Sequence, residues 1–301
     1  AKLIASLNYK GAAMRQLNYE LKQLCKHNRD GSYKTQSDRH KILQKVANDL
    51  YQLGYRGMAA RSLKQKHVEA LIQQYQAQNL SIGTLKNRLS TLRWWAEKIN
   101  RPQVVSSSNA SYGIGKREMV AKTSKAQTLD QQKLDLITDC YTRMSLELQA
   151  AFGLRREESI KFEPSYADQG DHIRLKSSWC KGGRPRTVLI RNEQQRKALD
   201  RAHQIAGKGS LIPPQWKYVQ QLRCYERQTE KSGLNKMHGL RHAYAQTRYE
   251  ELTGWLAPAC GGPTSKQLTA EQRKVDLKAR LTISAELGHK REQITATYLG
   301  S

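Results

Sequence analysis

The residues of this chain whose types can do chemistry are two arginines, a lysine, two histidines and a tyrosine. In chain order they are Arg155, Lys181, His238, Arg241, His289 and Tyr298. Each has an ordinary structural explanation when taken alone, because arginine and lysine usually lie on surfaces and tyrosine usually packs. His238 and Arg241 lie three residues apart, which puts both side chains on one face of a helix. The order and the combination therefore indicate function more strongly than any single residue.

This combination suits cleavage of a phosphodiester. The transition state places extra negative charge on the non-bridging phosphate oxygens, and the planar guanidinium groups of Arg155 and Arg241 can bind those oxygens bidentately. Preorganised donors of this kind commonly supply the largest share of catalysis. The hydroxyl of Tyr298 is a weak nucleophile, because its ordinary pKa is about 10. His238 is the candidate base that removes the proton of this hydroxyl.

Two further residues complete the scheme. Lys181, on a predicted β-hairpin, is the candidate acid for the leaving 5′-oxygen, and His289 is a candidate hydrogen-bond donor to the phosphate. The scheme predicts neither a metal ion nor a cofactor. The five cysteines are odd in number and show no CxxC spacing. This pattern argues against a zinc site and a disulfide framework, and it favours a reducing cytoplasm.

The charge of the chain indicates a polyanionic partner. The 301 residues include 52 Lys and Arg against 26 Asp and Glu, a formal net charge of +26. Such an excess repels itself in the folded state unless a polyanion neutralises it. No stretch approaches the roughly 20 apolar residues of a membrane span, and no N-terminal apolar run resembles a signal peptide. Nucleic acid is therefore favoured over an anionic membrane.

The part of the chain before residue 102 is predicted to be helical throughout. One helix is expected from Ser37-Asp38 to Leu53, where Gly54 would stop it, and others are expected to begin at Ser62 and at Ser81. Residues 102–124 are polar and irregular, with a serine run, and they predict a linker between two domains.

The second domain is predicted to begin at about residue 125, with a helix from Thr128 through Tyr141. Alternating apolar residues and a Gly182-Gly183 turn predict a β-hairpin within residues 172–190. Helices are expected to resume near Asn192.

The positive charge is denser in the N-terminal part. Residues 1–124 contain 22 Lys and Arg against 7 Asp and Glu, whereas the remaining 177 residues contain 30 against 19. A charged helix face is often only a solvated surface, but several basic helices in one small domain favour DNA binding. The candidate DNA contacts are Lys34, Lys86 and Arg88 in the N-terminal domain and Arg184 on the hairpin.

Several short motifs carry a resemblance to a known family. They are Gly153-Leu154-Arg155 with Glu158, the segment Cys180 to Thr187 around Lys181, His238-Gly239-Leu240-Arg241-His242-Ala243, Leu287-Gly288-His289, and Tyr298. In this order they resemble the active-site signature of the tyrosine recombinases, the group that includes the phage integrases. The helices before residue 101, above all Thr84 to Trp95, are similar to the core-binding domain of that family.

The resemblance implies a fold that is mainly α-helical, with a small β-hairpin or sheet in the catalytic domain. It implies a two-domain, C-shaped DNA clamp of the tyrosine recombinase type. Residues 1–101 would form the SAM-like core-binding domain, residues 102–124 the linker, and residues 125–301 the catalytic domain. The six residues named first would be catalytic, with Glu158 supporting Arg155.

The resemblance also implies the reaction and the partners. A 3′-phosphotyrosine intermediate and a Holliday junction would carry site-specific integration or excision. The DNA would be double-stranded recombination sites, bound by a homo-tetramer in the synaptic complex and by a monomer or dimer when free, without any membrane. The expected location is the cytoplasm of a bacterium that hosts a phage or mobile element, in association with the nucleoid.

Two departures from the family leave alternatives open. Arg241 and His289 lie 48 residues apart, longer than expected, and the surplus falls at about Thr253–Arg280. This insertion is either a tolerated surface loop or an extra contact with DNA or a neighbouring subunit. The chain also ends three residues after Tyr298, where many relatives continue. Either another interface replaces the missing segment, or the C-terminus is truncated.

Two rival functions are also compatible with a tyrosine and this fold. A type IB topoisomerase would relax supercoils without a defined site, and a catalytically inactive relative would only bind DNA. The compact basic N-terminal domain and the integrase-like motifs favour recombination over relaxation. All six catalytic positions carry residues that can perform the chemistry, which favours an enzyme over a protein that only binds DNA.

Overall fold

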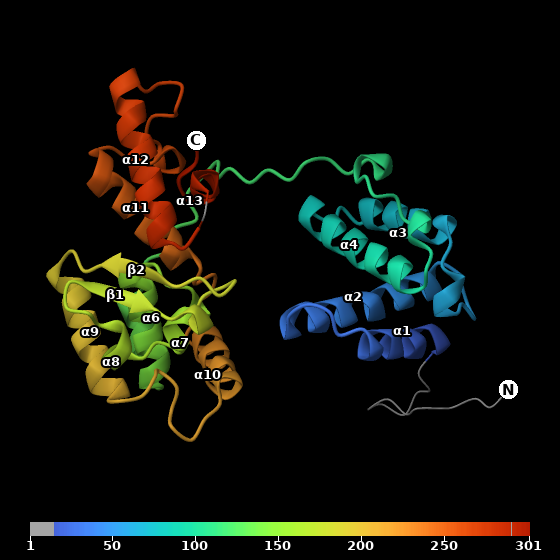
Figure 1. Ribbon diagram of the computed structural model, residues 1–301, viewed down its shortest axis with the longest axis horizontal. Coiled ribbons are helices and arrows are strands. Elements are labelled where there is room, and N and C mark those ends of the chain that lie inside the picture. The colour runs from blue at the N-terminus through green and yellow to red at the C-terminus, as the bar shows by residue number, and fades with distance from the viewer. Residues whose placement is uncertain (1–14, 290) are drawn as a thin grey trace. The chain divides into compact units, whose positions relative to one another are not determined.

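The computed structural model describes residues 15–289 and 291–301. It divides into two compact units, Ala1–Glu118 and Met119–Ser301, coloured blue to green and green to red in Figure 1. The chain is mainly helical, as the sequence predicts, and it contains one two-stranded sheet in its described part. Residues 1–14 of the predicted core-binding domain lie outside the described residues.

The first unit is built from helices around one apolar core. Its elements are α1 (Gln16–His27), α2 (Tyr33–Gln52), η1 (Ala60–Ser62), α3 (Gln65–Ala77), α4 (Ile82–Lys98), η2 (Pro102–Val104) and η3 (Ala110–Tyr112). The largest buried side chains of this core include Leu43, Leu50, Leu71, Tyr75, Leu89 and Trp95. The buried Tyr75 hydroxyl donates to Asp49 at 2.9 Å, so a polar group in the core is paired.

Of the three helix starts that the sequence predicts in the first unit, one is confirmed and two are wrong. Ser81 is the N-cap of α4, and its side chain accepts from the backbone N–H of Thr84. The predicted cap at Ser37 is wrong, because Ser32 already caps α2 one turn earlier. The start at Ser62 is wrong by about one turn, since η1 ends there and α3 begins at Gln65.

Much of the segment predicted to be a linker packs on one unit or the other. Val105 and Ile114 are buried in the core of the first unit. Arg93 on α4 donates to the carbonyl oxygen of Ser106 at 2.8 Å. Further along, the backbone N–H of Ala121 donates to the carbonyl oxygen of Ala296 at 2.9 Å, within the second unit.

The second unit carries the elements that position the site. They are α5 (Gln131–Asp135), α6 (Cys140–Phe152), α7 (Arg156–Ile160), α8 (Pro164–Ala167), β1 (His172–Leu175), η4 (Ser177–Trp179), β2 (Arg186–Leu189), α9 (Glu193–Ala206), α10 (Tyr218–Lys231), α11 (Gly239–Thr253), η5 (Pro258–Cys260), α12 (Ala270–Glu286), η6 (Glu292–Thr295) and α13 (Ala296–Leu299). Among these helices, α6 packs against both α9 and α11.

The predicted β-hairpin is confirmed. Strands β1 and β2 pair antiparallel, with Ile173 opposite Val188, and both of these side chains are buried. Strand β1 contacts α8, and β2 contacts α12. The hairpin is therefore fixed to the body of the unit at its strands and by the buried Trp179 and Cys180, while residues 181–185, which include Lys181, are exposed.

The single helix predicted from Thr128 through Tyr141 is wrong. Asp130 caps the short α5, and Asp139 caps a separate helix, α6, by accepting from the backbone N–H of Thr142 at 2.7 Å. A second strong N-cap residue inside the predicted range therefore starts a new helix. By contrast, Asn192 does cap α9, as the expected return to helix predicts. No helix in the described part of the chain is long and apolar enough to cross a membrane.

Candidate active site

Arg241 lies at the centre of the candidate site, on the first turn of α11, and its side chain is 1% exposed. Its guanidinium donates to the carbonyl oxygen of Gly153 at 2.5 Å and to that of Leu287. These two residues are the C-caps of α6 and α12, so the negative ends of two helix dipoles face the cation. Burial is the main cause that lowers the pKa of Arg241 to about 10, which leaves it charged near neutral pH.

Gly153 is required where α6 ends. Its φ of 61° is left-handed, and a Cβ there would lie 2.6 Å from Cδ1 of Tyr244. The glycine lets α6 stop abruptly and aim its last carbonyl at Arg241, and it starts the short turn that leads to Arg155.

Arg155 is the N-cap residue of α7, and Glu158 holds it. The backbone N–H and Nη1 of Arg155 each donate to the Glu158 carboxylate at 2.7 Å. Glu158 is completely buried, and Arg186 on β2 donates to both of its oxygens, at 2.8 and 2.6 Å. Burial alone would raise the pKa of Glu158, but Arg186, Arg241 and Arg155 lower it to about 2. The carboxylate therefore stays charged and fixes the orientation of Arg155.

Arg186, which no sequence motif predicted to be functional, lies beside this cluster. Its Nε donates to the carbonyl oxygen of Glu286 at 2.7 Å, and its side chain is 6% exposed. One signal was available in the sequence. Arg186 and Val188 are two residues apart on a strand and so share its inward face, where an arginine requires buried partners.

Tyr298 on α13 points into the same cluster. Its Oη accepts from Nε of Arg241 at 3.3 Å and lies 3.4 Å from Nε2 of His289. The tyrosine side chain is 5% exposed. The structure therefore brings together Arg155, Arg241, His289 and Tyr298, with Glu158 beneath them.

Two of the predicted histidines flank the tyrosine ring. His238 is the N-cap residue of α11, and its ring centroid lies 6.1 Å from that of Tyr298, against 5.8 Å for His289. Partial desolvation, with the charges of Arg241 and Arg155, lowers the pKa of His238. The same causes, in the same order, lower the pKa of His289 to about 4. Both imidazoles are thus neutral at neutral pH and able to accept a proton.

A third histidine, His242, lies in the same motif as His238 and Arg241, and the sequence predicted no role for it. It is 5% exposed, and its ring centroid lies 4.7 Å from that of Tyr298 and 5.6 Å from that of His238. Desolvation, helped by His238, lowers its pKa to about 4. Its Nδ1 is buried and has no hydrogen-bond partner among the described residues. The spacing of four residues between His238 and His242 on a helix was the available signal.

The structure does not bring Lys181 into contact with the other candidates. Lys181 and Arg184 are both exposed in the connection between β1 and β2, and Lys181 forms no hydrogen bond or ion pair with the described residues. Arg184 lines a cavity of about 310 Å³ together with Arg186 and His289. The hairpin connection thus borders the cluster through Arg184, and Lys181 is exposed in the same connection.

The three candidate DNA contacts of the first unit differ in their surroundings. Lys34 on α2 is exposed and forms an ion pair with Asp38 at 2.7 Å. Lys86 on α4 is half-buried. The guanidinium of Arg88, also on α4, lies 4.0 Å from the centroid of the Tyr75 ring, and its Nη1 is buried. Lys34 is therefore the most accessible of the three, and the guanidinium of Arg88 is partly occupied by its packing on Tyr75.

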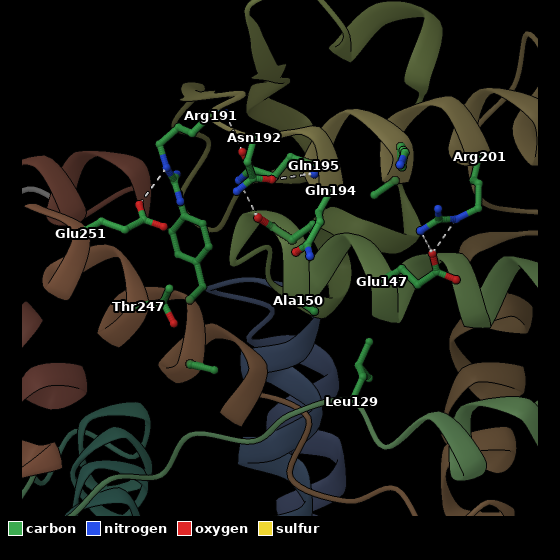
Figure 2. A pocket seen from close by; sticks show the side chains of 15 residues that line it. Leu129, Glu147, Ala150, Arg191, Asn192, Gln194, Gln195, Arg201, Thr247 and Glu251 are labelled. Atoms are coloured by element: carbon green, nitrogen blue, oxygen red, sulfur yellow. Dashed lines mark hydrogen bonds and ion pairs between the residues drawn. The ribbon is translucent and has the colours of Figure 1, made fainter. Parts of the chain in front are cut away.

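A separate cavity of about 470 Å³ lies between α6, α9 and α11, and Figure 2 shows the side chains around it. Four of its charged residues pair with one another: Arg191 with Glu251 at 3.2 Å, and Arg201 with Glu147 at 2.9 Å. None of the six catalytic candidates lines it. This cavity therefore does not belong to the candidate active site.

Comparisons with known proteins agree with this geometry. A family model described as "Phage integrase, N-terminal" matches residues 14–105, and one described as "Integrase" matches residues 114–247. The second match ends before α12 and Tyr298. A comparison with curated proteins found no match.

Several solved structures share the fold of the chain. One is a lambda integrase dimer bound to a COC′ core site, with a TM-score of 0.61 and 16% identity, covering 94% of this chain and 76% of that chain. Another is a lambda integrase tetramer bound to a Holliday junction, with a TM-score of 0.57 and 18% identity, covering 92% and 78%. A third is the XerH site-specific recombinase on a palindromic difH substrate, with a TM-score of 0.56 and 16% identity, covering 96% and 82%.

The two integrase family models together span most of the chain, and these solved structures have the same fold over nearly its whole length. The chain belongs to the tyrosine recombinase (phage integrase) family.

Proposed function

We propose that this protein is a site-specific DNA recombinase that cuts and rejoins strands through Tyr298. The observation that carries the proposal is the position of the Tyr298 hydroxyl, which lies 3.3 Å from Nε of Arg241 and 3.4 Å from Nε2 of His289 in the same chain. The similarity to lambda integrase on a core site and to XerH recombinase on difH supports it.

The strand is cut by attack of the Tyr298 oxygen on phosphorus. Arg155 and Arg241 bind the non-bridging oxygens and stabilise their added charge in the transition state. The neutral imidazole of His238 takes the proton of the hydroxyl, and His289 donates a hydrogen bond to the phosphate. A phosphate oxygen replaces the Tyr298 hydroxyl as the partner of Arg241.

The bond between phosphorus and the 5′-oxygen breaks as the bond to the tyrosine oxygen forms. Lys181 gives its proton to the leaving oxygen, so the products are a 3′-phosphotyrosine and a free 5′-hydroxyl. The ester keeps the energy of the broken bond, and a 5′-hydroxyl of another strand attacks it by the reverse route without ATP. Glu158 remains charged throughout and holds Arg155 in place.

The first unit would supply most of the sequence-independent affinity for double-stranded DNA. Its basic excess allows contacts with many phosphates, which position the protein without specifying sequence. Lys34 and Lys86 are the contacts we propose there, with Arg184 beside the cleaved phosphate. Recombination joins two sites, so we propose a tetramer on the junction, as in the lambda integrase complex. The cytoplasm of a host cell, at its nucleoid, is the proposed location.

Capture of covalent protein–DNA complexes tests this proposal. Sheared host genomic DNA carrying random nicks is incubated with the wild type or with Tyr298→Phe, denatured, and sequenced from the DNA that stays attached to protein. We expect attached DNA with the wild type only, at one or a few sequences.

Each other outcome contradicts a different part of the proposal. Attachment spread over arbitrary sequences, with relaxation of supercoiled plasmid, would indicate a topoisomerase. Binding to a defined site without any attachment would indicate a protein that only binds DNA. Attachment that persists in Tyr298→Phe would show that another residue is the nucleophile.

A further inference from the structure

The segment from Thr253 to Arg280, the insertion recognised in the sequence, packs against the C-terminal part of the chain. Ala257 is 1% and Ala259 8% exposed, and Ala257 shares a core cluster with Tyr298 and Leu299. Trp255 and Cys260 pack on the same cluster. The part of the segment around Ala257 therefore packs within the catalytic unit, whereas most residues from 265 to 275 are exposed.

A chain of hydrogen bonds runs from this segment to the residue that lies two positions after Tyr298. Arg280 is 7% exposed, and its Nη1 donates to the carbonyl oxygen of Gly300 at 2.9 Å. Its Nε donates to both oxygens of Asp276, at 2.8 and 3.0 Å. A buried arginine with these partners is held in one orientation.

The same chain of hydrogen bonds continues to α11 and to the inserted segment. The Tyr249 hydroxyl donates to Asp276 at 2.5 Å, and Nε1 of Trp255 donates to the Tyr249 oxygen at 3.2 Å. Trp255, Asp276 and Arg280 all fall within the insertion. Trp255, Tyr249 and Asp276 are therefore linked through Arg280 to the backbone carbonyl of Gly300, two residues after the proposed nucleophile.

Gly300 allows this close approach. Its φ is 77°, and a Cβ there would lie 2.8 Å from the backbone nitrogen of Ala259 and 3.0 Å from the carbonyl oxygen of Ala121. The backbone after Tyr298 thus rests directly on η5. No larger residue fits without displacing one of these two segments.

The four-residue helix α13 depends on such outside contacts. One turn of helix is unstable by itself, because few hydrogen bonds offset the cost of fixing the backbone. Gln246 donates to the carbonyl oxygen of Tyr298 at 2.9 Å, and Ala121 donates to that of Ala296 at 2.9 Å. Arg280 supplies the contact on the C-terminal side of the tyrosine.

We propose that the insertion fixes the position of the nucleophile. In this proposal Arg280 is a positioning residue that holds Tyr298 at Arg241 and His289. This inference rests on the proposed function, since it assumes that Tyr298 attacks the DNA. Through Arg280 the insertion then acts on the rate of the chemical step by placing one side chain, a role that requires no contact between the insertion and DNA.

The test replaces Arg280 by Met and measures single-turnover formation of the covalent complex on a nicked site at saturating protein. We expect Arg280→Met to slow this step by about tenfold or more, because small displacements of a reacting group have large effects on rate. Arg280→Lys should recover part of the rate, since one ammonium can bind Asp276 or Gly300. The matched control is Lys278→Met, an exposed residue on the same helix, which should stay within about twofold of the wild type.

A second measurement separates positioning from general damage. In Tyr298→Phe, added hydrogen peroxide supplies an external nucleophile, whose oxygen takes the place of the tyrosine oxygen at phosphorus. Adding Arg280→Met to this background should leave the peroxide-dependent cleavage unchanged, because the rest of the site is intact. An equal loss of peroxide-dependent cleavage would overturn the inference, and so would a wild-type rate for Arg280→Met.

Failure of the proposed function would look different. In that case the wild type itself would form no covalent complex, or Tyr298→Phe would still form one. Neither result depends on Arg280.

Discussion

At the scale of single residues, the candidate site depends on a balance between one fully buried carboxylate and the arginines around it. Glu158 faces Arg155, Arg186 and Arg241, and these charges hold its pKa at about 2. Arg186 is the partner that binds both carboxylate oxygens while also bonding to the end of α12. Without Arg186, the buried carboxylate of Glu158 has fewer positive charges beside it. Arg155 is then held less firmly, because the carboxylate that it binds is no longer fixed.

Arg186→Met should lower stability by about 3–5 kcal/mol, the usual result of breaking a buried ion pair from one side. It should also slow strand cleavage, because Arg155 loses its fixed carboxylate. Urea unfolding and single-turnover cleavage measure the two effects. Arg184→Met, at an exposed position two residues earlier, is the matched control for stability. Wild-type stability in Arg186→Met would show that the ion pair does not form.

The histidines at the tyrosine make stability depend on pH. The pKa values of His242 and His289 are about 4 in the folded protein, against about 6.5 in an unfolded chain. Between these values the unfolded chain binds more protons, so the contribution to stability is complete above about pH 6.5 and is lost as the pH falls towards 4.

Replacing both histidines by Asn should therefore weaken the loss of stability on going from about pH 7 to about pH 4.5. Thermal unfolding of the wild type and the double variant at the two pH values measures this difference. The same loss of stability in both proteins would mean that the two imidazoles are not held neutral by folding.

At the scale of elements, the β1–β2 hairpin carries the one catalytic candidate, Lys181, that does not contact the others among the described residues. Its strands are fixed by buried Ile173 and Val188, whereas Lys181 in the connection is exposed and unpaired among the described residues. A donor of the leaving-group proton must lie within hydrogen-bond distance of the 5′-oxygen. We therefore expect the exposed part of the connection to bring Lys181 to the 5′-oxygen when DNA binds.

Lys181→Ala should slow cleavage of ordinary DNA by about 100-fold or more, the usual range for a lost general acid. A site with sulfur in place of the leaving 5′-oxygen should restore most of the rate, because a thiolate leaves without a proton. Tyr298→Phe is the control, and sulfur should not rescue it. A Lys181→Ala defect that is equal on both substrates would assign the lysine to another role.

The sequence predicted elements well where one strong local signal decided them. The hairpin follows from alternating apolar residues, and Ser81 and Asn192 cap helices as expected. The errors occurred where two signals competed, as at Ser37 and at Thr128, since a better cap stood nearby in Ser32 or Asp139. Local patterns do not say which of two caps tertiary packing will use.

The sequence allowed most residues of the site to be predicted, but not their positions relative to one another. Order along the chain pointed to Arg155, Arg241, His289 and Tyr298, which the fold brings together. The supporting residues were not found, because Arg186, His242 and Arg280 act through contacts between elements distant in sequence. Local patterns marked Arg186 as inward-facing and His242 as lying on the same helix face as His238, but their partners depend on how distant elements pack, which no local pattern specifies.

At the scale of the whole molecule, charge is distributed unequally between the two parts of the chain. The first 124 residues carry 22 Lys and Arg against 7 Asp and Glu. Phosphate contacts dominate affinity for DNA and make it depend on salt, since each contact releases bound counterions. We therefore assign most of the sequence-independent binding to the helical first unit and the chemistry to the second.

Lys86→Ala should weaken binding to all DNA sequences by a similar factor and lower the slope of log affinity against log salt by about 1. Binding titrations at several salt concentrations, on the recombination site and on an unrelated duplex, measure both quantities. A changed preference between the two duplexes with an unchanged slope would make Lys86 a base contact instead.

The central claim is that Tyr298 forms the covalent bond to DNA, and mapping that bond tests it most directly. Trypsin cleavage after Arg291 releases residues 292–301, in which Tyr298 is the single tyrosine. After covalent complexes are trapped and their DNA is digested by nuclease, mass spectrometry should find this peptide with a nucleotide phosphate on Tyr298. A nucleotide on any other residue, or cut DNA without a modified peptide, would contradict the account.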